Sequence, residues 1–284
     1  MNDESSLNLT EMEKTREITE VREATRFEAV GHCIYCGSNS DLTDEHMIPF
    51  ALAGNLILPD SSCRACAKIT SDFERRVLRG FMEKARIAGD FPTRKPKRRP
   101  KSLTLQIGSD DGYENVELAP KDHPAILLLP LLEPPHFLTE RPNGEGVTAV
   151  GYEAIYFGKH PSDVAKDLQV TNIRASENWD LTSFGRLLAK IAYGYAVGVY
   201  GTIPREDVFV LPLILGLSDD ASVWLGSVEF ALAIEVRNPT HALASAWVPD
   251  PKNPANEILV VRVKLFADAG ATGYEIIVGQ RNLS

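Results

Sequence analysis

Residues 32–74 read HCIYCGSNSDLTDEHMIPFALAGNLILPDSSCRACAKITSDFE, and this segment contains all four cysteines of the chain. The cysteines form two C-x-x-C pairs, Cys33 with Cys36 and Cys63 with Cys66. A C-x-x-C turn presents two thiolates to one ion, and zinc prefers four thiolate or imidazole ligands in a tetrahedron. We therefore predict a structural Zn²⁺ site with a complete Cys₄ ligand set.

The composition is that of a water-soluble globular protein. Hydrophobic residues make up 44% and charged residues 24% of the 284 positions, which are ordinary values. The longest apolar run, at 125–132, is too short to cross a membrane and contains a proline. The first residues are acidic and lack the apolar core of a signal peptide. We therefore expect a cytoplasmic protein with no membrane partner, whose paired cysteines bind metal instead of forming disulfides.

Charge is distributed unevenly along the chain. The formal net charge is −9, yet residues 64–101 contain 13 Lys and Arg against 4 Asp and Glu. Local charge decides where a polyanion can dock. The basic segment therefore predicts a surface for a nucleic-acid backbone on an otherwise acidic protein.

Three ionisable residues, Asp44, Glu45 and His46, lie between the two cysteine pairs. A carboxylate beside an imidazole can bind a divalent ion while the imidazole takes a proton from water. Neighbouring side chains on a regular strand point to opposite faces. A distorted strand end is needed to bring Glu45 and His46 into one pocket, and Pro49 with Gly54 is typical of an irregular hairpin.

The order C-x-x-C, E-H-x-x-P, Gly-Asn, C-x-x-C and helix resembles the zinc-stapled HNH endonucleases, over roughly residues 32–80. The resemblance implies a ββα-metal fold, in which a hairpin and a helix surround one divalent ion, Mg²⁺ or Mn²⁺. It implies His46 as general base, Glu45 as metal ligand and Asn55 as the residue that orients the base. Asp44 would be an additional acid near the metal.

The sequence departs from the family at Ala67, where the family has Asn or His as a metal ligand. Glu74 is seven residues further on, close to the same face of the expected helix. It is a candidate ligand for the divalent ion, directly or through water, and the alternative is a solvated acid among arginines.

Local patterns divide the chain into segments. Residues 1–31 are charged and partly helical by pattern, with Ile18, Val21 and Ala24 as a thin apolar stripe; residues 32–90 form the nuclease module. Apolar residues recur every four positions within 64–88 and at helical spacing within 181–197, so both stretches predict helices. Residues 91–102 are rich in proline and basic residues and read as a linker or exposed arm. We expect residues 103–284 to form a separate α+β domain with a mostly antiparallel sheet, built from strand patterns at 102–108, 125–132, 146–158, 257–267 and 273–279.

The favoured interpretation is a metal-dependent HNH endonuclease that hydrolyses DNA phosphodiester bonds, with RNA as an open alternative. The C-terminal half would supply targeting, dimerisation into a homo-oligomer, or effector sensing. Two other readings stay open: a non-catalytic zinc-binding nucleic-acid adaptor with a degenerate HNH site, and a protein-interaction module in which zinc only stabilises the fold. The candidate nucleic-acid contacts are Arg64, Lys68, Arg75, Arg94, Lys95, Lys97, Arg98 and Arg99.

Overall fold

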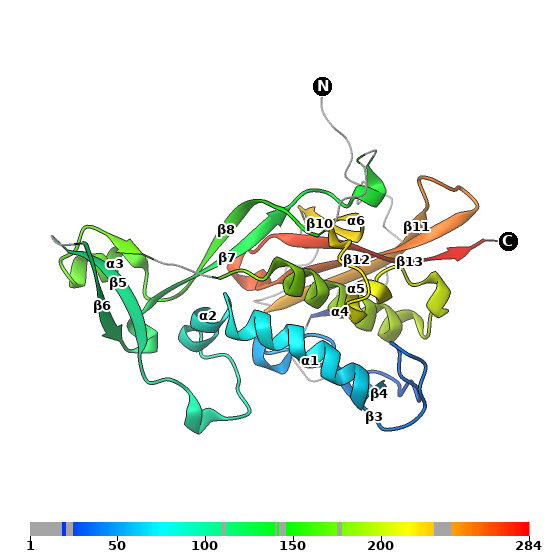
Figure 1. Cartoon of the computed structure of the whole chain (residues 1–284), viewed down its shortest axis with the longest axis horizontal. Helices are drawn as coiled ribbons and strands as arrows, with labels where there is room; N and C mark the ends of the chain where they lie inside the picture. Colours follow the sequence, from blue (N-terminus) through cyan, green and yellow to red (C-terminus); the bar gives the residue numbers. More distant parts are fainter. Residues whose placement is uncertain are drawn as a thin grey trace.

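The computed structural model describes residues 19–20, 25–109, 112–139, 141, 146–174, 178–229 and 240–283. Its described part is a mixed α+β structure with several small, mostly antiparallel sheets (Figure 1), as the sequence predicts. No helix in these ranges is long and apolar enough to cross a bilayer. The helix predicted within residues 1–31 falls largely outside the described residues, and the described parts form the short strands β1 (Thr19–Glu20) and β2 (Thr25–Arg26).

The cysteine segment folds into a hairpin followed directly by a helix. Strand β3 (Leu42–His46) pairs antiparallel with β4 (Leu56–Cys63), and β2 adds to β4 in parallel. Helix α1 (Arg64–Arg79) begins at the residue after β4. The hairpin loop needs glycine at Gly54, because a Cβ there would overlap the carbonyl oxygen of Ile48.

The strand distortion that the sequence requires is present. The register of β3 against β4 shifts between Thr43 and Glu45. Such a shift interrupts the regular alternation of side chains between the two faces of a strand. Glu45 and His46 pair in regular register with Leu58 and Ile57, and both line the same cleft at the point where β3 ends.

The helix expected over 64–88 is divided in two. Helix α1 ends at Arg79, and α2 (Glu83–Ala88) follows after a break at Gly80. A Cβ on Gly80 would lie 2.6 Å from the carbonyl oxygen of Arg76, so only glycine fits this tight turn without a shift. The break turns the chain, and the basic arm, residues 91–102, follows α2.

Helix α4 (Leu181–Tyr200) occupies the centre of the molecule. It packs between α1 on one side and strands β12 (Asn256–Leu265) and β13 (Gly273–Asn282) on the other (Figure 1). From Ser183 to Val197 every residue except Arg186 is buried. A helix that is apolar on nearly all sides is suited to such an enclosed position.

The remaining strands and helices belong to the central sheet or to a smaller region at one end of the molecule. The central sheet is antiparallel with the order β1-β11-β12-β13-β10, and it includes β10 (Leu225–Val228) and β11 (His241–Pro249). A smaller sheet of order β6-β5-β9 and helix α3 lie at one end of the molecule, joined to the centre by the β7–β8 hairpin (Figure 1). These further elements are β5 (Leu103–Ser109), β6 (Gly112–Leu118), β7 (Pro124–Leu132), β8 (Ala149–Gly158), β9 (Ile173–Arg174), α3 (Pro161–Asp167), α5 (Leu211–Leu215) and α6 (Ala221–Trp224).

One hydrophobic cluster contains side chains from both the cysteine segment and the C-terminal half. It extends from Tyr35 and Phe73 through Phe184 to Tyr274. Helix α1 and the central sheet therefore support each other through α4. The boundaries predicted at residues 90 and 103 stay a prediction, because a shared core does not show which segments fold independently.

Candidate metal centre and basic cleft

The four cysteines converge on one point, as their spacing predicts. Their sulfur atoms all lie within 4.8 Å of one another, and Cys36 Sγ is 3.6 Å from Cys63 Sγ. A tetrahedron with Zn–S bonds near 2.3 Å requires sulfur atoms about 3.8 Å apart. The donor set and its spacing therefore fit a structural Zn²⁺.

Local structure explains why these thiols meet. Gly37 has a φ of 81° and donates its amide hydrogen to the Cys33 carbonyl at 2.8 Å, which closes the first turn. Cys63 ends β4 and Cys66 lies in the first turn of α1. The Cys66 backbone amide lowers the pKa of Cys63 to about 7, which favours the thiolate that zinc binds. A bound ion would join the 33–36 turn to the junction of hairpin and helix.

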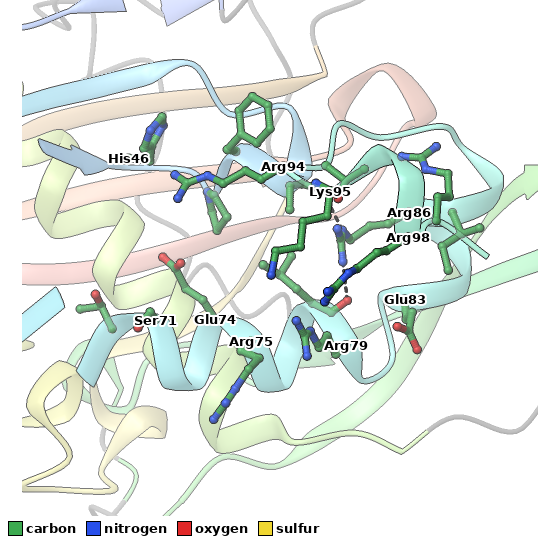
Figure 2. A pocket seen from close by; sticks show the side chains of 18 of the residues that line it. His46, Ser71, Glu74, Arg75, Arg79, Glu83, Arg86, Arg94, Lys95 and Arg98 are labelled. Carbon is green, nitrogen blue, oxygen red and sulfur yellow. Dashed lines mark hydrogen bonds between the residues drawn. The ribbon is translucent and has the colours of Figure 1, made fainter. Parts of the chain in front are cut away.

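A cleft of about 760 Å³ lies between the hairpin, α1 and the basic arm (Figure 2). It brings together Asp44, Glu45, His46 and Glu74 with Ala67, the position where the sequence departs from the family. Asn55 and three candidate nucleic-acid contacts, Arg64, Lys68 and Lys97, are not among its lining residues. The cations that line it are Arg75, Arg79, Arg86, Arg94, Lys95, Arg98 and Arg99.

His46 lies at the end of β3, with its ring against the ring of Phe50 at a centroid distance of 6.4 Å. Its Nδ1 is buried and has no hydrogen-bond partner among the described residues, so the orienting role of Asn55 stays a prediction. Burial, together with the charges of Lys190 and Arg94, lowers the pKa of His46. The imidazole is therefore neutral at neutral pH and can accept a proton.

Glu45 and Glu74 meet at the floor of the cleft, on either side of a lysine that the sequence patterns do not single out. Lys190 Nζ lies 2.7 Å from Glu45 Oε1 and 2.9 Å from Glu74 Oε1. Burial opposes the charge of this lysine, but the two carboxylates raise its pKa overall. The only sequence signal is the position of Lys190 on the apolar helix at 181–197, where a lysine is unusual without a partner.

The third acid is also paired. Asp44 Oδ2 lies 2.7 Å from the Arg26 guanidinium, and this contact lowers the pKa of Asp44. Among the described residues, the four cysteines form the one group of three or more His, Cys, Asp or Glu side chains close enough to hold a metal. In the described part of the chain, Asp44, Glu45 and Glu74 belong to no such group and are instead paired with cations.

The cations of the cleft fall into two classes. Arg86 and Arg99 have structural partners: Arg86 donates to the carbonyls of Ala51 and Leu78 at 2.8 and 2.6 Å, and Arg99 pairs with Asp90. Arg75 pairs with Asp72. Within the described ranges no ion pair joins the remaining four cations, and Figure 2 shows two of them, from the arm, extending into the space between His46 and α1. These four are Arg79, Arg94, Lys95 and Arg98.

Comparisons with protein-family models, with curated proteins and with solved structures give no match for this chain.

Proposed function

We propose that this chain is an HNH-type endonuclease that hydrolyses phosphodiester bonds of DNA in the basic cleft. The observation that carries the proposal is the placement of a neutral histidine, His46, in one cleft with four cations that form no ion pair with any described residue. A phosphate group needs such cations, and an attacking water needs a nearby base. The hairpin and helix that hold His46 follow the order that the resemblance implies.

In the proposed reaction, Arg94, Lys95 and Arg98 bind the phosphodiester through its charged oxygens. The His46 imidazole accepts a proton from water as the water oxygen forms a bond to phosphorus. The bond from phosphorus to the leaving oxygen breaks, and that oxygen leaves with the electron pair and takes a proton from solvent. A zinc ion on the four cysteines would hold the hairpin and α1 in register and would take no part in the chemistry.

The resemblance also implies a catalytic Mg²⁺ or Mn²⁺ on Glu45, with Asp44 as an additional acid, and helical spacing adds Glu74 as a candidate ligand. The arrangement of these residues does not support it, because Lys190 lies between the two glutamates and Arg26 pairs with Asp44. The metal dependence implied by the resemblance is therefore not part of this proposal, and the proposed reaction uses no ion other than the structural zinc.

The test is nicking of supercoiled DNA by zinc-loaded protein, with no added metal, with Mg²⁺ and with Mn²⁺. We expect nicking by the wild-type chain and its loss in His46→Ala. His160→Ala is a matched control, because His160 lies at the start of α3 and does not line the cleft. Equal nicking by wild type and His46→Ala, or a wild type that is inert under all three conditions, would refute the proposal. A parallel RNA substrate decides between the two nucleic acids.

The second candidate is a nucleic-acid adaptor that binds without cleaving. The observation that favours it is the pairing of both Glu45 and Glu74 with Lys190, together with Ala67 in place of a ligand. An adaptor would bind DNA with a strong salt dependence and leave it intact. If the chain neither cleaves nor binds DNA, the remaining reading is a protein-interaction module stabilised by zinc.

A further inference from the structure

Lys190 occupies an unusual position for a charged side chain. It lies on α4, between α1 and the central sheet, and its side chain has 0% exposure. A buried ammonium group is costly unless it is paired and hydrogen-bonded. Its contacts should therefore indicate why the fold keeps it.

The contacts of Lys190 all lead to the floor of the basic cleft. Its Nζ donates to the backbone carbonyls of His46 and Met47, the latter at 3.1 Å. The same atom pairs with Glu45 from the hairpin at 2.7 Å and with Glu74 from α1 at 2.9 Å. One ammonium group thus binds the strand end that carries His46 and joins the hairpin to the helix.

These contacts are similar to those that a bound metal ion would make. A divalent ion between a hairpin and a helix would take a carboxylate oxygen from each and fix their separation. Here the ammonium already takes Oε1 of Glu45 and of Glu74. The two carboxylates supply two negative charges and Lys190 supplies one positive charge, so the lysine compensates half of the negative charge at the floor of the cleft.

We propose that Lys190 is a positioning residue that serves as the fixed cation of this cleft, in the place where the resemblance puts a divalent ion. It holds Glu45, Glu74 and the backbone at His46, and the cleft takes up no metal between the two glutamates. The inference rests on the proposed function only in treating the cleft as the reaction site. It also explains Ala67: a side chain at that position has no metal to bind.

The test measures Mn²⁺ binding to zinc-loaded protein without DNA, using the electron paramagnetic resonance signal of free Mn²⁺. We expect wild type and Glu74→Gln to give the same binding curve, because Glu74 is already held by Lys190. Lys190→Met leaves two carboxylates facing an uncharged side chain, so it should gain one Mn²⁺ per chain. The double variant Lys190→Met/Glu74→Gln should lose that ion again.

Two outcomes would overturn the inference: a Mn²⁺ ion on the wild type that Glu74→Gln removes, or a folded Lys190→Met that gains none. Zinc content and near-ultraviolet circular dichroism report whether Lys190→Met is folded. If Lys190→Met does not fold, the Mn²⁺ binding curves of the wild type and Glu74→Gln are enough to test the inference.

Activity supplies a readout that a merely structural lysine would not change. Nicking by folded Lys190→Met should fall and should be partly restored by Mn²⁺, whereas Mn²⁺ should not enhance the wild type. Failure of the proposed function would appear instead as a wild type that does not cleave, and the Mn²⁺ binding curves would still stand.

Discussion

The basic arm offers the sharpest test of what the cleft binds. Arg94, Lys95 and Arg98 are exposed, line the cleft and have no ion pair in the described part of the chain. The perturbation is the triple change to glutamine, which removes three charges and keeps the side chains polar. Arg99 stays unchanged, because its contacts with Asp90 and with the Phe91 carbonyl hold the arm in place.

Its magnitude follows from the number of free cations. Each phosphate neutralised on duplex DNA contributes about 0.9 to the slope of log K against log salt concentration, so three lost contacts should flatten that slope by about 2.7. Between 50 and 200 mM salt, a slope difference of about 2.7 corresponds to roughly a 40-fold difference in how far affinity falls.

The assay is fluorescence anisotropy of a labelled duplex at several salt concentrations, in a His46→Ala background that prevents cleavage. The matched control is Lys97→Gln/Lys101→Gln, because these two lysines are exposed on the same arm and do not line the cleft. An unchanged slope in the triple variant would refute the reasoning. An equal change per charge in the control would show that the arm acts by its total charge and not through the cleft.

Three other predictions concern the base, the metal centre and a buried histidine. His46→Ala should lower the nicking rate by about 10²–10⁴-fold, which is the usual contribution of a general base. Because burial lowers the pKa of His46, the nicking rate of the wild type should reach half its maximum below pH 6.5. Cys36→Ser should lose zinc and, since structural zinc contributes on the order of 10 kcal/mol to folding, should unfold residues 32–90; full zinc content by elemental analysis would contradict this. His241, whose Nε2 donates to the Leu52 carbonyl, has its pKa lowered to about 4 by burial. The unfolded chain therefore binds a proton that the folded chain excludes, and the free energy of unfolding should fall by about 3 kcal/mol as pH drops from about 6.5 to about 4; urea titrations of wild type and His241→Gln measure it, and identical pH dependence would refute it.

The parts of the site that depend on the spacing of residues along the chain can be predicted from the local sequence. The C-x-x-C pairs predict the convergence of the thiols, and the adjacency of Glu45 and His46 predicts an irregular strand end; the structure has a register shift just before Glu45, and β3 ends at His46. Periodicity predicts helices over 64–88 and 181–197, but it does not predict the break at Gly80, because that break depends on a close backbone contact.

Contacts between residues that are far apart in the sequence cannot be predicted from these local patterns. Lys190 is 144 residues from His46 in sequence, and a lysine within an apolar helix gives no indication of which carboxylate it will meet. Glu74 illustrates the same limit: helical spacing places it correctly on the face of α1 toward the cleft, yet spacing alone does not reveal that its partner is an ammonium group. The position of the arm over the cleft also depends on tertiary contacts, those of Arg86 and Arg99.

The pairing of the acids also decides whether a chain with a net charge of −9 can attract a polyanion to this cleft. Glu45 and Glu74 are held by Lys190, and Asp44 by Arg26, and neither cation is among the lining residues. Two positive charges from outside the lining thus compensate two of the three negative charges on these acids, and the seven lining cations outweigh the remainder. Counter-charges at close range reduce a field far more than charges spread over a distant surface, since screening at physiological salt acts over about 8 Å. A phosphate backbone near the cleft would therefore meet a positive surface, and replacing Lys190 would weaken that attraction although Lys190 itself contacts no solvent.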